Sequence, residues 1–201
     1  MVSIVRENAN DKPFLLVSAG FSPEAQEHTR RTFEPFRNDF DVLLVTYNDE
    51  VRNEQKVCVT KSDRLGEYTL YKRLGVEISR YLRNLNINNV AIIAKSAGAT
   101  VLSYLPDEIH VRAISLLAPA PVCLSAYAGT EEIVQQFACT RRRMPLLLGW
   151  DLNDPKIPRA IGYEVCIGFL KAGGYTVEFA GYNYASHDFN PEFVNQAIKR
   201  S

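Results

Sequence analysis

The chain has 201 residues, and its 23 lysine and arginine side chains are balanced by 23 aspartate and glutamate side chains, so its formal net charge is zero. This length fits one domain, taken as residues 1–201 with a core over about 13–200, and it is enough to bury a large hydrophobic core. A zero charge balance offers no electrostatic attraction to nucleic acid or to an anionic membrane surface, so we expect neither as a partner.

Features that are missing from the sequence constrain its location and its cofactors. The N-terminus has no long apolar segment of the kind found in signal peptides. No apolar run approaches the roughly 18 residues that a membrane-spanning helix requires. The four cysteines lack the paired spacing of a zinc site. We therefore expect a cytoplasmic protein that holds neither a metal ion nor a cofactor.

Short apolar runs alternate with amphipathic runs along the whole chain. The expected strands are residues 14–18, 42–46, 90–93, 113–117, 145–149 and 176–179. Strands that are apolar on both faces are typical of a parallel sheet covered by helices on both sides. The pattern predicts an α/β fold, a three-layer sandwich with a mostly parallel central sheet of about six strands.

Helix signals lie between these strands. Ser22 and Pro23 have the residue types preferred at an N-cap and at the first helical position, and Asn190 and Pro191 repeat the pattern near the C-terminus. The expected helices run from Pro23 toward Phe36, over residues 69–85, from the turn at Ser96, around residues 133–137, from Pro158 to Gly173 and from Pro191 onward. Residues 48–67 are expected to form a long polar connection, with a possible short strand at 57–59.

One strand ends in a turn that could carry chemistry. The apolar run from Val90 to Ala94 ends abruptly in Lys95-Ser96-Ala97-Gly98, and a helix-forming stretch follows. A strand, a serine among small residues and a helix describe a sharp strand-to-helix turn. Such a turn holds the serine hydroxyl at the N-terminus of the helix. Ser96 is therefore a candidate nucleophile.

A serine hydroxyl needs a general base, which is usually a histidine held by a carboxylate. The sequence contains three histidines. His28 lies within the first expected helix, and His110 precedes the fourth strand, at the amino end of the sheet. His187 follows the last strand, at the carboxyl edge where functional groups gather in an open parallel sheet. Elimination therefore favours His187 as the base.

The loop after the fifth strand offers two carboxylates to orient this histidine. Asp154 lies in an Asn-Asp-Pro turn and can curl back over the edge of the sheet, so it is the preferred acid. Asp151 is nearer the end of the strand and could replace it or fix the backbone of the loop. Either aspartate could instead be a simple turn former.

An oxyanion requires two preorganised backbone donors. The amide of Ala97, after the serine, is one candidate. The amide of Phe21 is the other, because Gly20 permits a tight path in the turn after the first strand. A serine–lysine pair through Lys95 is an alternative arrangement, but adjacent residues on a sharp turn project in different directions. We expect Lys95 to be solvated or ion-paired.

Four segments resemble parts of the α/β-hydrolase family. They are residues 17–21, 94–98, 149–158 and 186–189. Residues 94–98 resemble the family's nucleophile elbow Gly-x-Ser-x-Gly, with Ala94 at the first glycine, and the order Ser96, Asp154, His187 is the family's order. The other segments resemble its oxyanion segment, with Ala19 where histidine is frequent, its acid loop and its histidine loop. The resemblance covers about residues 13–200.

The resemblance implies a minimal, lidless α/β-hydrolase fold. The short segment before the first expected strand leaves little room for the extra antiparallel strands common at the family's N-terminus. The interval 118–143 leaves no space for a large cap. The implied activity is that of a serine hydrolase that cleaves a small-molecule carboxylic ester or thioester through an acyl-enzyme intermediate. Tyr47, Trp150 and Tyr184 could line the open site.

Two other functions remain to be compared with this one. A catalytically silent binding or regulatory protein could share the fold, and the alanines at positions 19 and 94 motivate that alternative. A nucleotide-binding protein would need a Gly-x-Gly-x-x-Gly or Walker sequence after its first strand, but that turn has a single glycine, Gly20. The acyl group, the leaving group and the oligomeric state are left open by the sequence.

Overall fold

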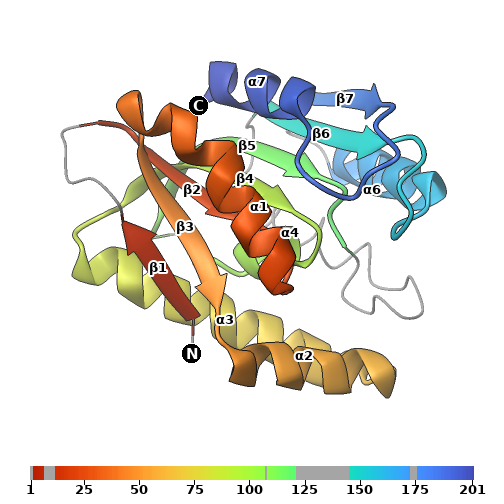
Figure 1. Cartoon of the computed structure of the whole chain (residues 1–201), viewed down its shortest axis with the longest axis horizontal. Helices are drawn as coiled ribbons and strands as arrows, with labels where there is room; N and C mark the ends of the chain where they lie inside the picture. Colours follow the sequence, from red (N-terminus) through yellow and green to blue (C-terminus); the bar gives the residue numbers. More distant parts are fainter. Residues whose placement is uncertain (1, 7–11, 107, 121–144, 173–175) are drawn as a thin grey trace.

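A seven-stranded sheet forms the centre of the molecule (Figure 1). The computed structural model describes residues 2–6, 12–106, 108–120, 145–172 and 176–201. The strands are β1 (Val2–Arg6), β2 (Phe14–Ser18), β3 (Asp41–Tyr47), β4 (Asn89–Lys95), β5 (His110–Leu117), β6 (Pro145–Asp151) and β7 (Thr176–Tyr182). Their order across the sheet is β1-β3-β2-β4-β5-β6-β7, and every neighbouring pair is parallel except β1 with β3. The expected α/β class with a mostly parallel sheet is confirmed.

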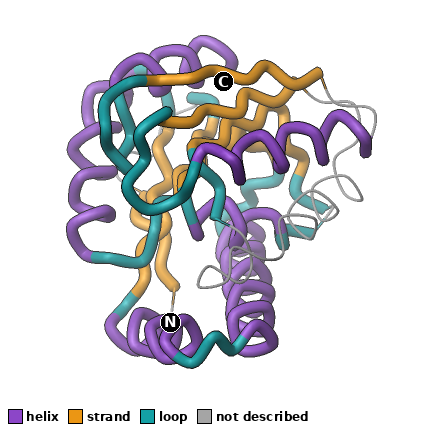
Figure 2. Tube along the Cα trace, turned by 90° about the vertical axis from the view of Figure 1, so that its right-hand side faces the viewer, coloured by secondary structure: helices purple, strands orange, loops and turns teal. Residues whose placement is uncertain are grey.

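Helices cover both faces of this sheet (Figure 2). They are α1 (Pro23–Phe33), the 3₁₀ helix η1 (Glu34–Asn38), α2 (Asp49–Thr60), α3 (Arg64–Asn84), α4 (Ala97–Ser103), α6 (Arg159–Ala172) and α7 (Pro191–Arg200). On one face the core joins strand residues such as Ile92 to α3, α4 and α6. On the other face it joins residues such as Ile93 to Phe33 at the end of α1 and to α7. Adjacent residues of β4 thus belong to opposite cores, which explains why the strand is apolar throughout.

The N-terminal strand β1 was not expected, and the sheet has one strand more than predicted. Val2 and Ile4 are buried while Ser3 and Val5 are exposed, which is the alternation of a strand with one face in the core. Val2 pairs with Tyr47 and Arg6 with Leu43 at the edge of the sheet. The period-two pattern of the first residues was the available signal.

The expected polar connection at residues 48–67 is wrong, because it contains helix α2 and the first turn of α3. Asn48 caps α2 by accepting a hydrogen bond from the Val51 amide at 3.1 Å. Val51 and Cys58 are buried, seven residues apart on one face of the helix. An ion pair of 2.6 Å between Arg73 and Glu54 joins α3 to α2. So narrow an apolar stripe predicts a helix only weakly from the sequence. Packing against α3, rather than the intrinsic helix propensity of these residues, stabilises α2.

The expected helix caps are present, although some helix ends differ from the prediction. The side chains of Ser22 and Asn190 accept hydrogen bonds from backbone amides three residues further on. Helix α1 ends at Phe33 rather than near Phe36, because a 3₁₀ turn containing Pro35 begins there. Helix α3 begins at Arg64, five residues earlier than expected. The helix expected around residues 133–137, and most of the interval expected to exclude a cap, lie outside the described residues.

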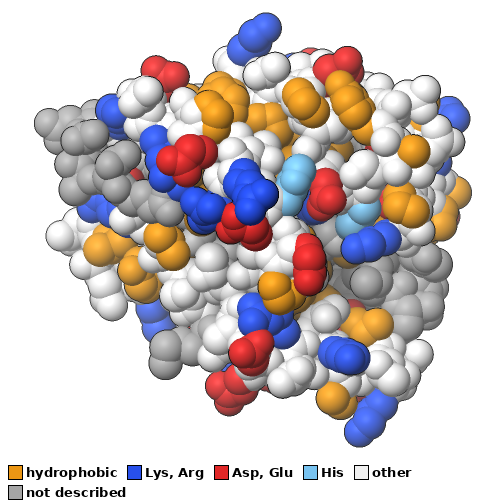
Figure 3. All heavy atoms as spheres, in the orientation of Figure 1, with side chains coloured by type: hydrophobic (Ala, Val, Ile, Leu, Met, Phe, Trp, Pro, Cys, Tyr) orange, Lys and Arg blue, Asp and Glu red, His pale blue; other side chains and the backbone are white. Residues whose placement is uncertain are grey.

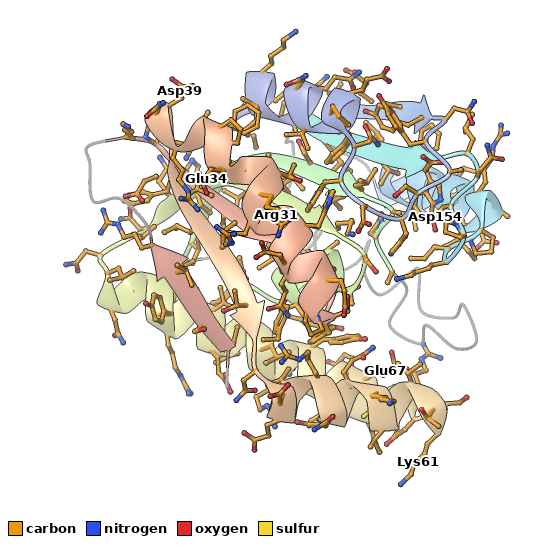
Figure 4. The ribbon with its side chains drawn as sticks, in the orientation of Figure 1. Arg31, Glu34, Asp39, Lys61, Glu67 and Asp154 are labelled. Atoms are coloured by element: carbon orange, nitrogen blue, oxygen red, sulfur yellow. The ribbon has the colours of Figure 1, made fainter. Side chains whose placement is uncertain are left out.

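Charged side chains of both signs are interspersed on the face drawn in Figure 3. On helix α1, Glu27 contacts both Arg30 and Arg31, and on η1 Glu34 contacts Arg37. Arg31 and Glu34 are labelled in Figure 4. Within the described ranges, no helix is both long and apolar enough to cross a membrane.

Candidate active site

The carboxyl ends of β2, β4, β6 and β7 bring the predicted site residues to one edge of the sheet. These strands run parallel, so the segments that follow them share that edge. Ser18 at the end of β2 is opposite Ala94 of β4, which sets the turn after β2 (residues 19–22) beside the turn at Ser96. Ser96 follows β4, Asp154 lies in the loop after β6, and His187 lies in the loop after β7. We call these last two segments the acid loop (residues 152–158) and the histidine loop (residues 183–190).

Ser96 has a strained backbone, with φ of 53° and ψ of −135°. Few residues other than glycine adopt such a conformation, and it persists only where surrounding contacts impose it. The Ser96 amide donates to the Leu117 carbonyl at 3.1 Å, and the Ser96 carbonyl accepts from the amides of Ala99 and Ala120. These bonds fix Ser96 in a sharp strand-to-helix turn at the head of α4, as the sequence predicted.

Gly98 allows the turn after β2 to approach the Ser96 turn closely. A Cβ atom at Gly98 would lie 2.3 Å from the carbonyl oxygen of Ala19 and 2.6 Å from Oγ of Ser18. Backbone cannot yield to such a contact without moving the turn. The alanine at position 94, by contrast, is fully buried in β4 and fits there. Of the two small positions around Ser96, the second is the one that requires glycine.

We expect Gly98→Ala to lower the free energy of unfolding by at least about 1–3 kcal/mol, because the added methyl group collides with the backbone of residue 19. Urea denaturation measures the change. Gly20→Ala is the matched control, since its Cβ would meet Ser96 Oγ at an ordinary 3.9 Å. Its stability should stay within about 1 kcal/mol of the wild type. Equal stabilities of the two variants would contradict the close approach at Gly98.

Asp154 and His187 form a hydrogen-bonded pair. The distance between His187 Nδ1 and Asp154 Oδ2 is 2.6 Å, and both side chains are almost completely buried. The other oxygen of Asp154 accepts from the amides of Lys156 and Ile157 at 2.7 and 2.9 Å. The acid loop (Asp154 is labelled in Figure 4) therefore holds the carboxylate so that one oxygen faces the ring. An imidazole bound through Nδ1 keeps Nε2 for proton transfer.

Ser96 and His187 line one hollow of about 150 Å³. Its other lining residues are Gly20, Phe21, Ser22, Ala25, Gln55, Lys95, Ala97 and Lys156. The structure thus brings the predicted nucleophile and base to the same small space, with Asp154 bound to the base. His28 and His110 do not line it; His28 instead contacts the Phe189 carbonyl through Nε2.

Phe21 and Ala97, the predicted oxyanion donors, also line the hollow. In the described part of the chain neither amide donates to a backbone carbonyl. The Phe21 carbonyl accepts from Nε2 of Gln26 at 3.0 Å, and Oε1 of Gln26 accepts from the Tyr47 amide. Gln26 therefore fixes the peptide that follows Phe21, a role that the sequence did not reveal.

Asp151 has a different role from Asp154. It is buried, and its carboxylate accepts from the amides of Asn153, Tyr184 and Ala185 at 3.0, 2.7 and 3.1 Å. One side chain thus joins the acid loop to the histidine loop. Of the two candidate acids, the structure places Asp154 against His187, while Asp151 fixes the backbone.

The structure does not place the three predicted substrate-contacting aromatics in this hollow. Tyr47 is buried, and its ring packs at a tilt against that of Phe21, with centroids 4.3 Å apart. Its hydroxyl is hydrogen-bonded to Ser18, and burial raises the pKa of that hydroxyl. Trp150 is fully buried and donates to the Ile157 carbonyl at 3.2 Å. Both belong to the core because β3 and β6 turn these side chains inward. Tyr184 is exposed but is not a lining residue.

Lys95 is ion-paired, one of the two states expected for it. Its ammonium donates to Oδ1 of Asp188 at 2.7 Å. Burial lowers the pKa of this ammonium, and the bond to Asp188 opposes that shift. A protonated amine held by a carboxylate is a poor general base for Ser96.

Among the described residues, no group of three or more histidine, cysteine and acidic side chains could hold a metal ion.

Solved structures share this architecture, although no protein-family model and no curated protein sequence matches the chain. A carboxylesterase from Bacillus cereus superposes with a TM-score of 0.62 at 16% identity, covering 98% of this chain and 91% of that one. YahD, solved with malic acid, gives 0.66 at 14% identity over 99% and 97%. An alpha/beta hydrolase from a lagoon-sediment metagenome in Morocco gives 0.60 at 11% identity over 98% and 93%. At these identities the likeness concerns the fold alone.

Proposed function

Because the chain has the α/β-hydrolase fold, we propose that it is a serine hydrolase that cleaves a carboxylic ester or a thioester. One observation carries the proposal: Ser96, on a strained strand-to-helix turn, shares a hollow with His187, which is hydrogen-bonded to Asp154. These three groups are the nucleophile, base and orienting acid that acyl transfer requires.

In this mechanism Oγ of Ser96 attacks the acyl carbon while Nε2 of His187 accepts the hydroxyl proton. Asp154 keeps the imidazole in the correct tautomer and stabilises its protonated form. The amides of Phe21 and Ala97 donate to the oxyanion of the tetrahedral intermediate. The carbon–oxygen or carbon–sulfur bond to the leaving group then breaks, and His187 returns the proton to that alcohol or thiol. Water, activated by His187, releases the acid from Ser96 by the same steps.

The size of the hollow favours a small acyl group. About 150 Å³ is below the roughly 300–1,000 Å³ of typical small-molecule pockets, and polar side chains such as Gln55 line the hollow alongside Phe21. A substrate panel graded by acyl length should therefore show the highest kcat/KM for short chains.

A fluorophosphonate probe tests the proposal, because it reacts with a serine only when that serine is activated as a nucleophile. We expect the wild-type protein to be labelled, and peptide mass spectrometry should locate the adduct on Ser96. Ser22, which also lines the hollow, is an internal control, since its hydroxyl caps α1 and should stay unmodified. An unlabelled, folded protein would favour the catalytically silent alternative.

A further inference from the structure

Lys95 is a buried cation that the proposed mechanism does not use. It directly precedes Ser96, lines the same hollow and pairs with Asp188, the residue after His187. The Lys95 side chain is 2% exposed, whereas that of Asp188 is 48% exposed. The ammonium also lies 5.7 Å from the centroid of the Phe189 ring. The pair therefore joins the two segments that carry the nucleophile and the base.

Several contacts attach the histidine loop to the rest of the molecule; among them, Asn153 donates to Asn183 and His28 of α1 contacts the Phe189 carbonyl. Asp151 binds the amides of Tyr184 and Ala185, and Asp154 binds His187. Both of these carboxylates follow or end β6, so they fix the histidine loop only relative to that strand. Among the side-chain bonds of the described residues, the Lys95–Asp188 pair is the contact that attaches the loop to β4, the strand that leads into Ser96.

We propose that Lys95 and Asp188 are positioning residues that hold His187 in place relative to Ser96. Each is adjacent in sequence to one of the two reacting groups, so the ion pair limits how far Ser96 and His187 can move apart. This inference rests on the proposed function to the extent that it treats Ser96 and His187 as nucleophile and base.

Burial of Lys95 makes the attachment strong. A buried ammonium is unfavourable unless it is paired, whereas water can solvate the half-exposed carboxylate of Asp188. Moving the histidine loop away from β4 would leave the ammonium buried without its partner. The need of Lys95 for a counter-charge therefore holds the loop against β4. Neutralising both residues should remove the cost of the buried unpaired charge from the folded state without restoring the attachment.

Protonation of Lys95 gives the pair a pH dependence. Burial lowers the pKa of the ammonium below its ordinary value of 10.5, Asp188 and Asp154 raise it, and Lys156 lowers it further. Burial raises the pKa of the Asp188 carboxyl, but Lys95, with His28 and His187, lowers it overall. The charged form of Lys95 is the attached form. Activity should therefore fall as the pH rises through the lowered pKa of Lys95.

Four variants separate positioning from general stability: Lys95→Met, Lys95→Arg, Asp188→Asn and the double variant Lys95→Met/Asp188→Asn. Arg6→Met is the matched control, because Arg6 pairs at 2.7 Å with the buried Asp41 at the far edge of the sheet. Hydrogen exchange of a peptide covering residues 182–190 reports loop attachment, and the rate of fluorophosphonate labelling reports alignment of Ser96 with His187. The temperature of unfolding reports stability.

We expect Lys95→Met and Asp188→Asn to raise exchange of this peptide and to lower the labelling rate, each by at least about tenfold. The double variant should unfold at a higher temperature than Asp188→Asn but be labelled no faster, because the buried charge is gone and the attachment is still missing. Lys95→Arg should retain most of the labelling rate. Its activity should no longer fall at alkaline pH, because a guanidinium group stays protonated there. Arg6→Met should leave the exchange of residues 182–190 unchanged.

The inference would be overturned if Asp188→Asn showed the same exchange and labelling rates as the wild type. It would also be overturned if the double variant regained the labelling rate together with its stability. If Lys95→Met does not fold, Asp188→Asn decides, because its side chain is half exposed. Hydrogen exchange is measured whether or not the protein reacts. Absence of Ser96 labelling in the wild type would therefore count against the proposed function, while unchanged exchange in the variants would count against the positioning pair.

Discussion

Replacing Ser96 with alanine is expected to lower kcat/KM for a small activated ester, such as p-nitrophenyl acetate, by about 10⁴-fold or more. The substitution removes the atom that forms the acyl-enzyme, so the residual rate would come from the oxyanion donors and from binding alone. His187→Ala should cause a loss of similar size, because Ser96 then has no acceptor for its proton. The double variant should be little worse than either single variant, since the two groups act as one unit.

Ser103→Ala is the control for this prediction. Ser103 lies on the same helix α4, is buried and donates its hydroxyl to the Thr100 carbonyl at 2.7 Å, away from the hollow. It should retain kcat/KM within about threefold and lose only about 1 kcal/mol of stability. His110→Ala, at the amino end of β5, is the corresponding control for the histidine. Full activity of Ser96→Ala or His187→Ala would exclude the proposed mechanism.

Asp154→Asn is expected to lower kcat by about 10⁴-fold while leaving the fold intact. The amide oxygen of asparagine can still accept from Lys156 and Ile157, as Oδ1 of the aspartate does. The amide nitrogen would then face His187 and donate to Nδ1. The imidazole proton would move to Nε2, so the ring could no longer accept the proton of Ser96. Steady-state kinetics together with a thermal melt separates this tautomer effect from unfolding.

Asn153→Ala controls for disturbance of the acid loop. Its side chain donates to Asn183 at 2.7 Å on the surface and does not contact His187. We expect its kcat to stay within about threefold of the wild type. If Asp154→Asn kept more than about a tenth of the wild-type kcat, another group would have to orient His187, and Asp151 would become the candidate acid.

The sequence was most informative about those roles in the site for which it offered few candidate residues. Three histidines and one serine in a strand-to-helix turn left a single consistent pair, Ser96 and His187. The choice between the two aspartates could not be made with the same certainty. Both follow the same strand, and only the turn of residues 154–157 decides which carboxylate faces the ring. The roles of Tyr47 and Trp150 could not be settled either, since aromatic side chains suit a core and a pocket equally well.

The fold shows a similar division. Strands β2 to β6 were predictable because each contains a compact run of apolar residues, and β7 was predictable from the alternating residues 176–179. The caps of α1 and α7 were predictable because capping depends on neighbouring residues. Helix α2 was not, because only two of its twelve residues are buried, so its apolar signal is weak. Strand β1 was overlooked because its short alternating pattern gains its stability from pairing with β3.

The sequence alone therefore determined the fold class, the parallel strands whose carboxyl ends bring three loops to one edge, and the residues proposed as nucleophile and base. These features depend on local pattern and on the elimination of a few rare residues. Only the tertiary structure decided that Asp154 binds His187, that Asp151 and Gln26 fix the surrounding backbone, and that Lys95 pairs with Asp188. Such contacts join residues up to 93 positions apart. They depend on where the folded chain brings side chains together, and no local pattern in the sequence records that.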